Sequence, residues 1–161
     1  MGQDIKLSIN ECKFKYRVSG ILKVNDKVLT VQMNDNGFYC FPGGHVELME
    51  NTKEAIIREF KEETEIDVEI EKLLYITENF FDGKLGKFHE VGFYYLLKPK
   101  NKLDTKDFTR IEEDKNQKMK LEFKWQDINN LQNFKPEFVK KEIKNINVEC
   151  KHFIILNDKI I

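Results

Sequence analysis

The chain has 161 residues, which suits one compact domain, since a single hydrophobic core usually takes roughly 100–200 residues. Its 27 Lys and Arg residues balance 28 Asp and Glu residues to a formal net charge of -1, whereas proteins that bind long nucleic acid are usually basic. Hydrophobic residues make up 40% of the chain, which excludes disorder throughout.

Alternating apolar residues predict β-strands in the first part of the chain. Phe14, Tyr16 and Val18 share one face of a strand, and residues 28–31 predict a second strand after the turn at 25–26. Residues 38–41 predict a third strand, because they follow a cluster of turn residues.

A glycine-rich loop and a helix follow. The loop Pro42-Gly43-Gly44 contains two glycines, which lack a Cβ and can adopt backbone conformations that other residues disfavour. Residues Thr52 to Thr64 have helical composition, and Asn51 or Thr52 is available as the N-cap. We therefore predict a helix over Thr52–Thr64.

The next part of the chain predicts strands. Residues 68–80 and 87–97 are rich in β-branched and aromatic side chains and flank a turn at 82–86, as in a long hairpin. The charged stretch Lys98–Gln117 predicts a long loop. Apolar residues alternate with charged ones from Met119 to Trp125, which predicts a strand with one exposed face.

The end of the chain predicts one more helix and one more strand. A helix beginning near Pro136 fits the helical spacing of the apolar residues from Phe138 to Ile146, and the apolar run 153–156 predicts a strand. Strands interleaved with two helices indicate the α/β (α+β) class, with a mixed β-sheet between helices. No linker or repeat divides the chain, so we predict a single domain over residues 1–161.

Neither a membrane segment nor a disulfide framework is predicted. No run approaches the ~18 consecutive apolar residues of a membrane span, and residues 1–11 lack the apolar core of a signal peptide. The three cysteines, at positions 12, 40 and 150, are widely spaced and form no CxxC pattern. These features favour the reducing cytoplasm.

Three carboxylates gather on one side of the predicted helix. At about 100° per residue, Glu59, Glu62 and Glu63 fall within one arc, while the apolar residues fall on another. One interpretation is a solvated face paired with lysines. The other is a cation site beside the glycine loop, where Glu47 and Glu50 add two further acids.

The kind of cation follows from the donor atoms. Carboxylate oxygens suit Mg²⁺ or Mn²⁺, which bind phosphate oxygens at their remaining positions. Soft metals need sulfur or imidazole clusters, and His45, His89 and His152 are scattered along the sequence. A cation site here therefore predicts a diphosphate compound as the substrate.

The glycine loop and the helix together resemble the sequence box of Nudix hydrolases. That box is Gly, five residues, Glu, seven residues, Arg-Glu, an apolar residue, any residue, Glu-Glu, any residue, Gly and an apolar residue. With the spacing intact, this chain matches it at Gly44, Glu50, Arg58, Glu59, Phe60, Glu62, Glu63 and Ile66. The order of the surrounding strands is also similar to the family.

Two positions differ from what is common in the family. Glu65 stands where the box has glycine, at a helix end where glycine commonly takes a left-handed backbone. Met49 replaces a glycine that is frequent, though not required, before the first Glu of the box. We expect the change at Glu65 to affect the exit from the helix and not the set of metal ligands.

The resemblance implies a Nudix domain with a divalent-metal site. It assigns metal binding to the Gly43 carbonyl and to Glu59, Glu62 and Glu63, with Mg²⁺ or Mn²⁺ as the cofactor. The catalytic residues would be Glu59, Glu62 and Arg58, with Arg58 holding the glutamates of the box in place by ion pairing.

Further residues are candidates for the remaining roles. Glu59 is a candidate general base, but some family members use a glutamate from a later loop, and the candidates here are Glu112, Glu113 and Glu122. The residues expected to support the site structurally are Gly44, Glu47 and Glu50, and Glu47 is also a candidate auxiliary metal ligand. The candidates for contact with the substrate are Arg17, His45 and Glu113.

The reaction implied by the resemblance is attack of water on a phosphorus atom of a pyrophosphate. The substrate would be a nucleoside diphosphate linked to another moiety, such as a nucleoside triphosphate. The alternatives left open are ADP-ribose or a dinucleotide, a capped RNA end, and a Nudix-fold module that binds nucleotides without cleaving them. The expected partners are small nucleotides and neither long nucleic acid nor a membrane, and the expected state is a monomer or homodimer.

Overall fold

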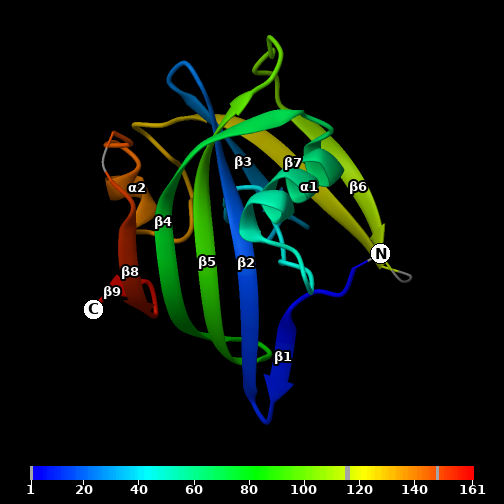
Figure 1. Ribbon diagram of the computed structural model, residues 1–161, viewed down its shortest axis with the longest axis vertical. Helices are drawn as coiled ribbons and strands as arrows, with labels where there is room; N and C mark the ends of the chain where they lie inside the picture. The colour runs from blue at the N-terminus through cyan, green and yellow to red at the C-terminus, as the bar shows by residue number, and fades with distance from the viewer. Residues whose placement is uncertain (1, 115–116, 148) are drawn as a thin grey trace.

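The computed structural model describes residues 2–114, 117–147 and 149–161, and strands dominate it (Figure 1). The helices of this part of the chain are α1 (Thr52–Thr64) and α2 (Val139–Glu142). The strands are β1 (Lys6–Ile9), β2 (Cys12–Val24), β3 (Lys27–Met33), β4 (Val68–Gly83), β5 (Gly86–Pro99), β6 (Phe108–Asp114), β7 (Gln117–Asp127), β8 (Lys151–Leu156) and β9 (Lys159–Ile160). Within the described ranges, no helix is long and apolar enough to cross a membrane.

The described strands form one mixed sheet. Its order is β6-β7-β3-β2-β5-β4-β8-β9, and β1 pairs with β2 outside this path. β2 runs parallel to β5, and β4 runs parallel to β8, whereas the other neighbours are antiparallel. Figure 1 shows β2, β5 and β4 side by side as long strands in the middle of the molecule.

Each face of the sheet is covered by a helix-bearing segment, because neighbouring residues of a strand point to opposite faces. On one face, Val18 and Leu22 of β2 belong to the same buried cluster as Phe60 of α1. On the other face, Ile21 belongs to a buried cluster with residues 128–143, which include α2. The predicted class, a mixed sheet between helices, is therefore confirmed.

The predicted loop over Lys98–Gln117 is wrong over residues 108–114, which form β6. Residues 101–107 carry neither helix nor strand, and residues 115–116 lie outside the described residues. β6 pairs with β7, and the ring of Phe108 stacks on Phe123 with ring centroids 4.6 Å apart. β6 ends the sheet order, and an edge strand commonly carries charged side chains. The charges that suggested a loop are therefore those of an edge strand.

Two other predicted elements are shorter than expected. Residues 38–41 make only isolated bridges, to β3 and to Phe134, instead of a strand. The helix predicted near Pro136 has only four residues. The apolar spacing still marked the buried side chains, since Phe138 and Ile143 pack in the core beside α2.

Candidate metal and catalytic site

The helix that carries the predicted site begins and ends where the sequence indicates. α1 spans Thr52–Thr64, and the Asn51 side chain caps it by accepting hydrogen bonds from two backbone amides of the first turn. The Glu54 side chain completes a capping box. Glu65 follows with φ of 59° in the left-handed region, so this glutamate adopts the backbone that the glycine of the box would supply.

In space, the glycine loop of residues 42–44 lies between β2 and α1. The Gly44 carbonyl accepts a hydrogen bond from the Val18 amide at 2.9 Å. Gly43 has φ of 149°, and a Cβ at this position would collide with the Val18 carbonyl oxygen. A Cβ on Gly44 would collide with the Glu59 carboxylate. Position 43 needs glycine, because only a bare backbone can approach the strand this closely. At position 44, glycine leaves the Glu59 carboxylate in its place, and a larger residue would make that side chain move.

Arg58 joins this loop to the helix. Its Nε and Nη2 atoms donate to the two carboxylate oxygens of Glu50, each at 2.8 Å, and Nη2 also donates to the His45 carbonyl at 3.1 Å. Its Nη1 atom donates to Glu59 at 2.9 Å and to Glu62 at 3.1 Å. The bonds to Glu50 raise the pKa of Arg58, and they lower the pKa of the Glu50 carboxyl.

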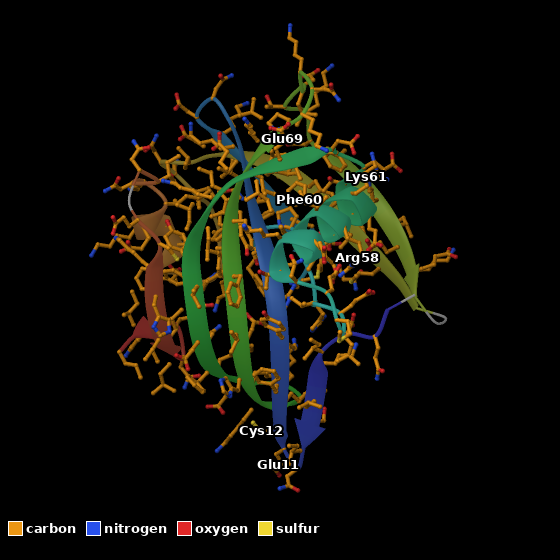
Figure 2. The ribbon with its side chains drawn as sticks, in the orientation of Figure 1. Glu11, Cys12, Arg58, Phe60, Lys61 and Glu69 are labelled. Atoms are coloured by element: carbon orange, nitrogen blue, oxygen red, sulfur yellow. The ribbon has the colours of Figure 1, made fainter. Side chains whose placement is uncertain are left out.

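Figure 2 separates the two sides of α1. Phe60 lies on the side toward the central strands, where it is fully buried, and Arg58 lies on another side, toward the glycine loop. One face of the helix therefore fixes it to the sheet, and the other presents Arg58 and the carboxylates to the loop.

Glu59 and Glu63 are half-buried carboxylates of the helix, whereas Glu62 is exposed. Glu63 accepts a hydrogen bond from the Gly43 amide at 3.1 Å. Burial, together with the charges of Glu59 and Glu112, raises the pKa of Glu63 to about 8. Burial also raises the pKa of Glu59, although Arg58 counteracts this. A cation bound here would offset both the burial and the repulsion.

Of the three glutamates predicted from later in the chain, Glu112 is the one that lies near the acids of α1. Burial raises the pKa of Glu112, and the charge of Glu62 raises it further. Glu113 forms an exposed ion pair with Lys118 at 3.0 Å. Glu122 accepts a hydrogen bond from a tyrosine hydroxyl at 3.0 Å. The structure thus brings Glu112 to the candidate site and directs Glu113 and Glu122 elsewhere.

His45 and Glu47 face the N-terminal segment. His45 Nδ1 lies 3.8 Å from the Asp4 carboxylate, and burial lowers the pKa of His45 to about 4, so its ring is neutral at pH 7. The Glu47 carboxylate lies against Gly2, and the Glu47 amide donates to Glu50 at 3.0 Å. Glu47 therefore supports Glu50 through its backbone.

Arg17 connects the glycine loop to a cleft of about 500 Å³. Its Nη2 atom donates to the Gly43 carbonyl at 3.3 Å, and its Nη1 atom lies 3.8 Å from the Glu90 carboxylate. Its Nε atom is buried without a partner among the described residues. The aromatic and cationic side chains that line the cleft include Phe38, Phe81, Tyr94, Lys15 and Lys135.

The sequence predicts Arg17 as a substrate contact but does not predict the rest of the cleft. The lining comes from segments far apart in the chain, between Lys15 and Asp158, and an abundance of aromatic residues does not distinguish cleft from core. A second hollow of about 500 Å³ lies at the carboxyl end of α1, and its lining, which includes Ile66, Leu103 and Trp125, contains none of the predicted site residues.

The oxygen donors of this region fit a hard divalent cation in their chemistry, although the side chains are not assembled around one point. Within residues 2–114, 117–147 and 149–161, no three His, Cys, Asp or Glu side chains are arranged to hold a metal ion. Arg58 engages Glu59 and Glu62, and Glu63 faces the Gly43 amide. Carboxylate and carbonyl oxygens are the ligands that Mg²⁺ and Mn²⁺ prefer, and the loop and helix present these groups.

The sequence of this chain matches a known protein family. A family model described as NUDIX domain matches residues 13–145. An ADP-ribose pyrophosphatase of Methanocaldococcus jannaschii is 38% identical over 60 residues, which are 35% of this chain and 36% of that protein. The chain spans about a third of the length of the curated relatives it matches.

Solved structures share the fold at low sequence identity. A MutT Nudix hydrolase from Burkholderia pseudomallei has a TM-score of 0.60 at 19% identity and covers 83% of this chain and 98% of its own. An ADP-ribose pyrophosphatase from Streptococcus suis has a TM-score of 0.53 at 18% identity and covers 89% of this chain and 98% of its own. At these identities the neighbours show a common fold and no more.

Proposed function

This chain belongs to the Nudix family, and from that premise we propose that it is a divalent-metal-dependent pyrophosphohydrolase. Its proposed substrate is a nucleoside diphosphate linked to another moiety, with a nucleoside triphosphate and ADP-ribose as the first two cases to test. The observation that carries the proposal is the double contact of Gly43. Its amide bonds to Glu63 and its carbonyl to Arg17, so the carboxylates and the cleft meet at one residue.

The proposed metal ligands are the Gly43 carbonyl and the side chains of Glu59, Glu62 and Glu63, which would hold Mg²⁺ or Mn²⁺. When bound, the metal would neutralise the phosphate charges and lower the pKa of a bound water. Burial of Glu59 and Glu63 supports this assignment, because each carboxylate has an elevated pKa that a nearby cation would bring down.

The other residues of the box would orient these ligands. Arg58 holds one oxygen each of Glu59 and Glu62, and Glu50 fixes the guanidinium from the opposite side. Gly44 leaves room for the Glu59 carboxylate. The proposed role of these groups is to reduce the freedom of the carboxylates before substrate arrives.

The chemical step would be attack of water on one phosphorus atom, with cleavage of the bond from that atom to the bridging oxygen. The proton of the water would pass to a carboxylate. Glu59 is the proposed acceptor, and Glu112 is the alternative, because its charge reaches Glu62 and Glu63. A carboxyl with a raised pKa is a more effective base near neutral pH.

The cleft beside Arg17 is the proposed substrate site. Arg17 would contact a phosphate, since guanidinium groups bind phosphate oxygens well, and Phe38, Phe81 and Tyr94 supply flat surfaces on which a base could stack. His45 and Glu113, the other predicted substrate contacts, are not part of the described lining.

A metal-dependent substrate panel tests the proposal. The purified chain is incubated with nucleoside triphosphates, ADP-ribose, a dinucleotide and capped RNA, with and without Mg²⁺ or Mn²⁺, and the products are identified. We expect cleavage of a pyrophosphate only with metal, and a sharp fall in Glu62→Gln and Glu63→Gln with folding retained. Tight nucleotide binding without cleavage of any substrate would instead indicate a binding module.

Two further parts of the proposal concern the setting of the protein. We propose a cytoplasmic location, because the free thiols Cys12, Cys40 and Cys150 suit a reducing compartment. We also propose a monomer or homodimer that binds small nucleotides. Light scattering measures the oligomeric state, and a larger assembly would contradict this part.

A further inference from the structure

Glu65 has contacts that a glycine at this position could not make. It ends α1 with a left-handed backbone, where glycine has the lowest strain. Its carboxylate accepts a hydrogen bond from Arg110 Nη1 at 2.6 Å. Arg110 belongs to β6, 45 residues later in the chain, so the side chain of Glu65 joins the helix end to the edge of the sheet.

Arg110 binds the end of the helix at two points. Besides Glu65, its Nη2 atom donates to the Thr64 carbonyl at 3.2 Å. The last carbonyls of a helix lack partners within it and carry partial negative charge, so a cation is favourable there. Figure 1 shows this end of α1 beside β6. The guanidinium thus docks β6 onto α1.

The same face of β6 carries Glu112. Residues two apart in a strand share a face, and Arg110 and Glu112 pair with Leu121 and Met119 of β7. Leu121 is fully buried in the core that contains α1, and Met119 packs against that core. Arg110 and Glu112 therefore lie on the side of β6 that faces the helix.

β6 has a strand neighbour on one edge only, because it ends the sheet order and pairs with β7. Strand pairing therefore does not fix the distance between β6 and α1. The contacts of Arg110 with Thr64 and Glu65 provide a direct link between β6 and the helix. Glu112 lies on the same strand, two residues beyond Arg110. It interacts electrostatically with Glu62 and Glu63.

We propose that Arg110, with Glu65 as its anchor, is a positioning residue that holds Glu112 of β6 beside the carboxylates of α1. The inference rests on the proposed function, in which those carboxylates bind a divalent cation. In this inference, Glu65 keeps the left-handed backbone of the glycine that the box has at this position, and its side chain adds a link to β6.

A double-mutant cycle on the full chain tests the inference without substrate. Mn²⁺ affinity is measured by electron paramagnetic resonance for the wild type, Arg110→Met, Glu112→Gln and the double variant. The charge of Glu112 beside the carboxylates of α1 would add to their attraction for a cation. We therefore expect each single change to weaken Mn²⁺ binding by about 10-fold, the low end for residues that surround metal ligands. In the Glu112→Gln background, Arg110→Met should have almost no further effect, because Arg110 acts through Glu112.

Glu65→Gln and Asp67→Asn are the matched variants at the same helix end. Glu65→Gln keeps the size of the side chain but removes the charge that anchors Arg110, so it should weaken Mn²⁺ binding, though less than Arg110→Met. Asp67 pairs with Lys61 at 2.9 Å and has no described contact with β6. Asp67→Asn should therefore leave Mn²⁺ affinity unchanged.

The outcomes separate this inference from the proposed function. Independent, multiplying effects of Arg110→Met and Glu112→Gln would overturn it, because Arg110 would then support the fold only. An unchanged Mn²⁺ affinity in Glu112→Gln would overturn it as well. Coupled effects in a protein that cleaves no nucleotide would support the positioning role while the proposed hydrolase activity failed.

Discussion

Arg58 binds both carboxylate oxygens of Glu50, through Nε and Nη2, each at 2.8 Å. The geometry is a planar fork, which arginine forms and lysine cannot. Since the remaining nitrogen, Nη1, reaches Glu59 and Glu62, the orientation set by Glu50 determines where these two carboxylates are held.

Arg58→Lys should therefore impair the site even though the charge is kept. We expect activity or metal affinity to fall by about 10–100-fold, and the free energy of unfolding to fall by about 1–3 kcal/mol from lost charge-assisted hydrogen bonds. Steady-state kinetics and thermal unfolding measure the two effects. Lys61→Gln, which removes another cation of α1, is the control, and equal activity of both variants would contradict the role of Arg58.

Gly44→Ala should displace Glu59, because the added Cβ would collide with its carboxylate. We expect a fall of at least about 10-fold in activity, the smallest loss usual when a supporting contact of a ligand is disturbed. Gly37→Ala is the matched control. Its Cβ would have no neighbour within 4 Å, although its φ of 89° disfavours alanine, so Gly37→Ala should lose some stability and keep its activity.

Glu63→Gln should stabilise the metal-free protein while it removes a proposed ligand. Glu63 is a half-buried carboxyl whose pKa is raised by desolvation and by the charges of Glu59 and Glu112. An uncharged amide of the same shape can keep the hydrogen bond from Gly43. We expect a gain of about 1 kcal/mol, which raises Tm by about 2–4 °C in a chain of this size. Calorimetry in the presence of a chelator measures it, and a lower Tm would contradict the account.

Cys40 should be the least reactive of the thiols. Burial raises its pKa to about 11, and the thiolate is the reactive form. At pH 8 such a thiol is about 0.1% thiolate, against about 24% for an ordinary thiol with a pKa of 8.5. In a Cys12→Ser/Cys150→Ser variant, alkylation of Cys40 should be slow and should accelerate about tenfold per pH unit from pH 8 to 10. Fast labelling at pH 8 would be inconsistent with this burial.

The part of the site that lies within one segment was predictable from the sequence. Asn51 and Glu54 supply a capping box, and the spacing of apolar and acidic residues gives α1 its bounds and its two faces. These features depend on local backbone geometry, which repeats at a known period. The loop and the helix could therefore be placed together before the fold was known.

The parts that depend on distant contacts were not predictable in the same way. The charges of Arg110 and its neighbours predict a loop where β6 lies, and the contact that explains Arg110 is with Glu65, 45 residues earlier. Among the later glutamates, the face of β6 decides which one reaches the site, and it selects Glu112 over Glu113. Neighbouring residues of a strand point to opposite faces. This rule separates Glu112 from Glu113 only once residues 108–114 are known to form a strand.

Location of the metal tests the central claim most directly. A crystal of the wild-type chain is soaked in MnCl₂, and anomalous scattering is recorded at a wavelength where manganese dominates. We predict an anomalous peak bounded by the Gly43 carbonyl and the carboxylates of Glu59, Glu62 and Glu63. A structure with no peak there, from protein that hydrolyses its substrate at the same manganese concentration, would contradict it.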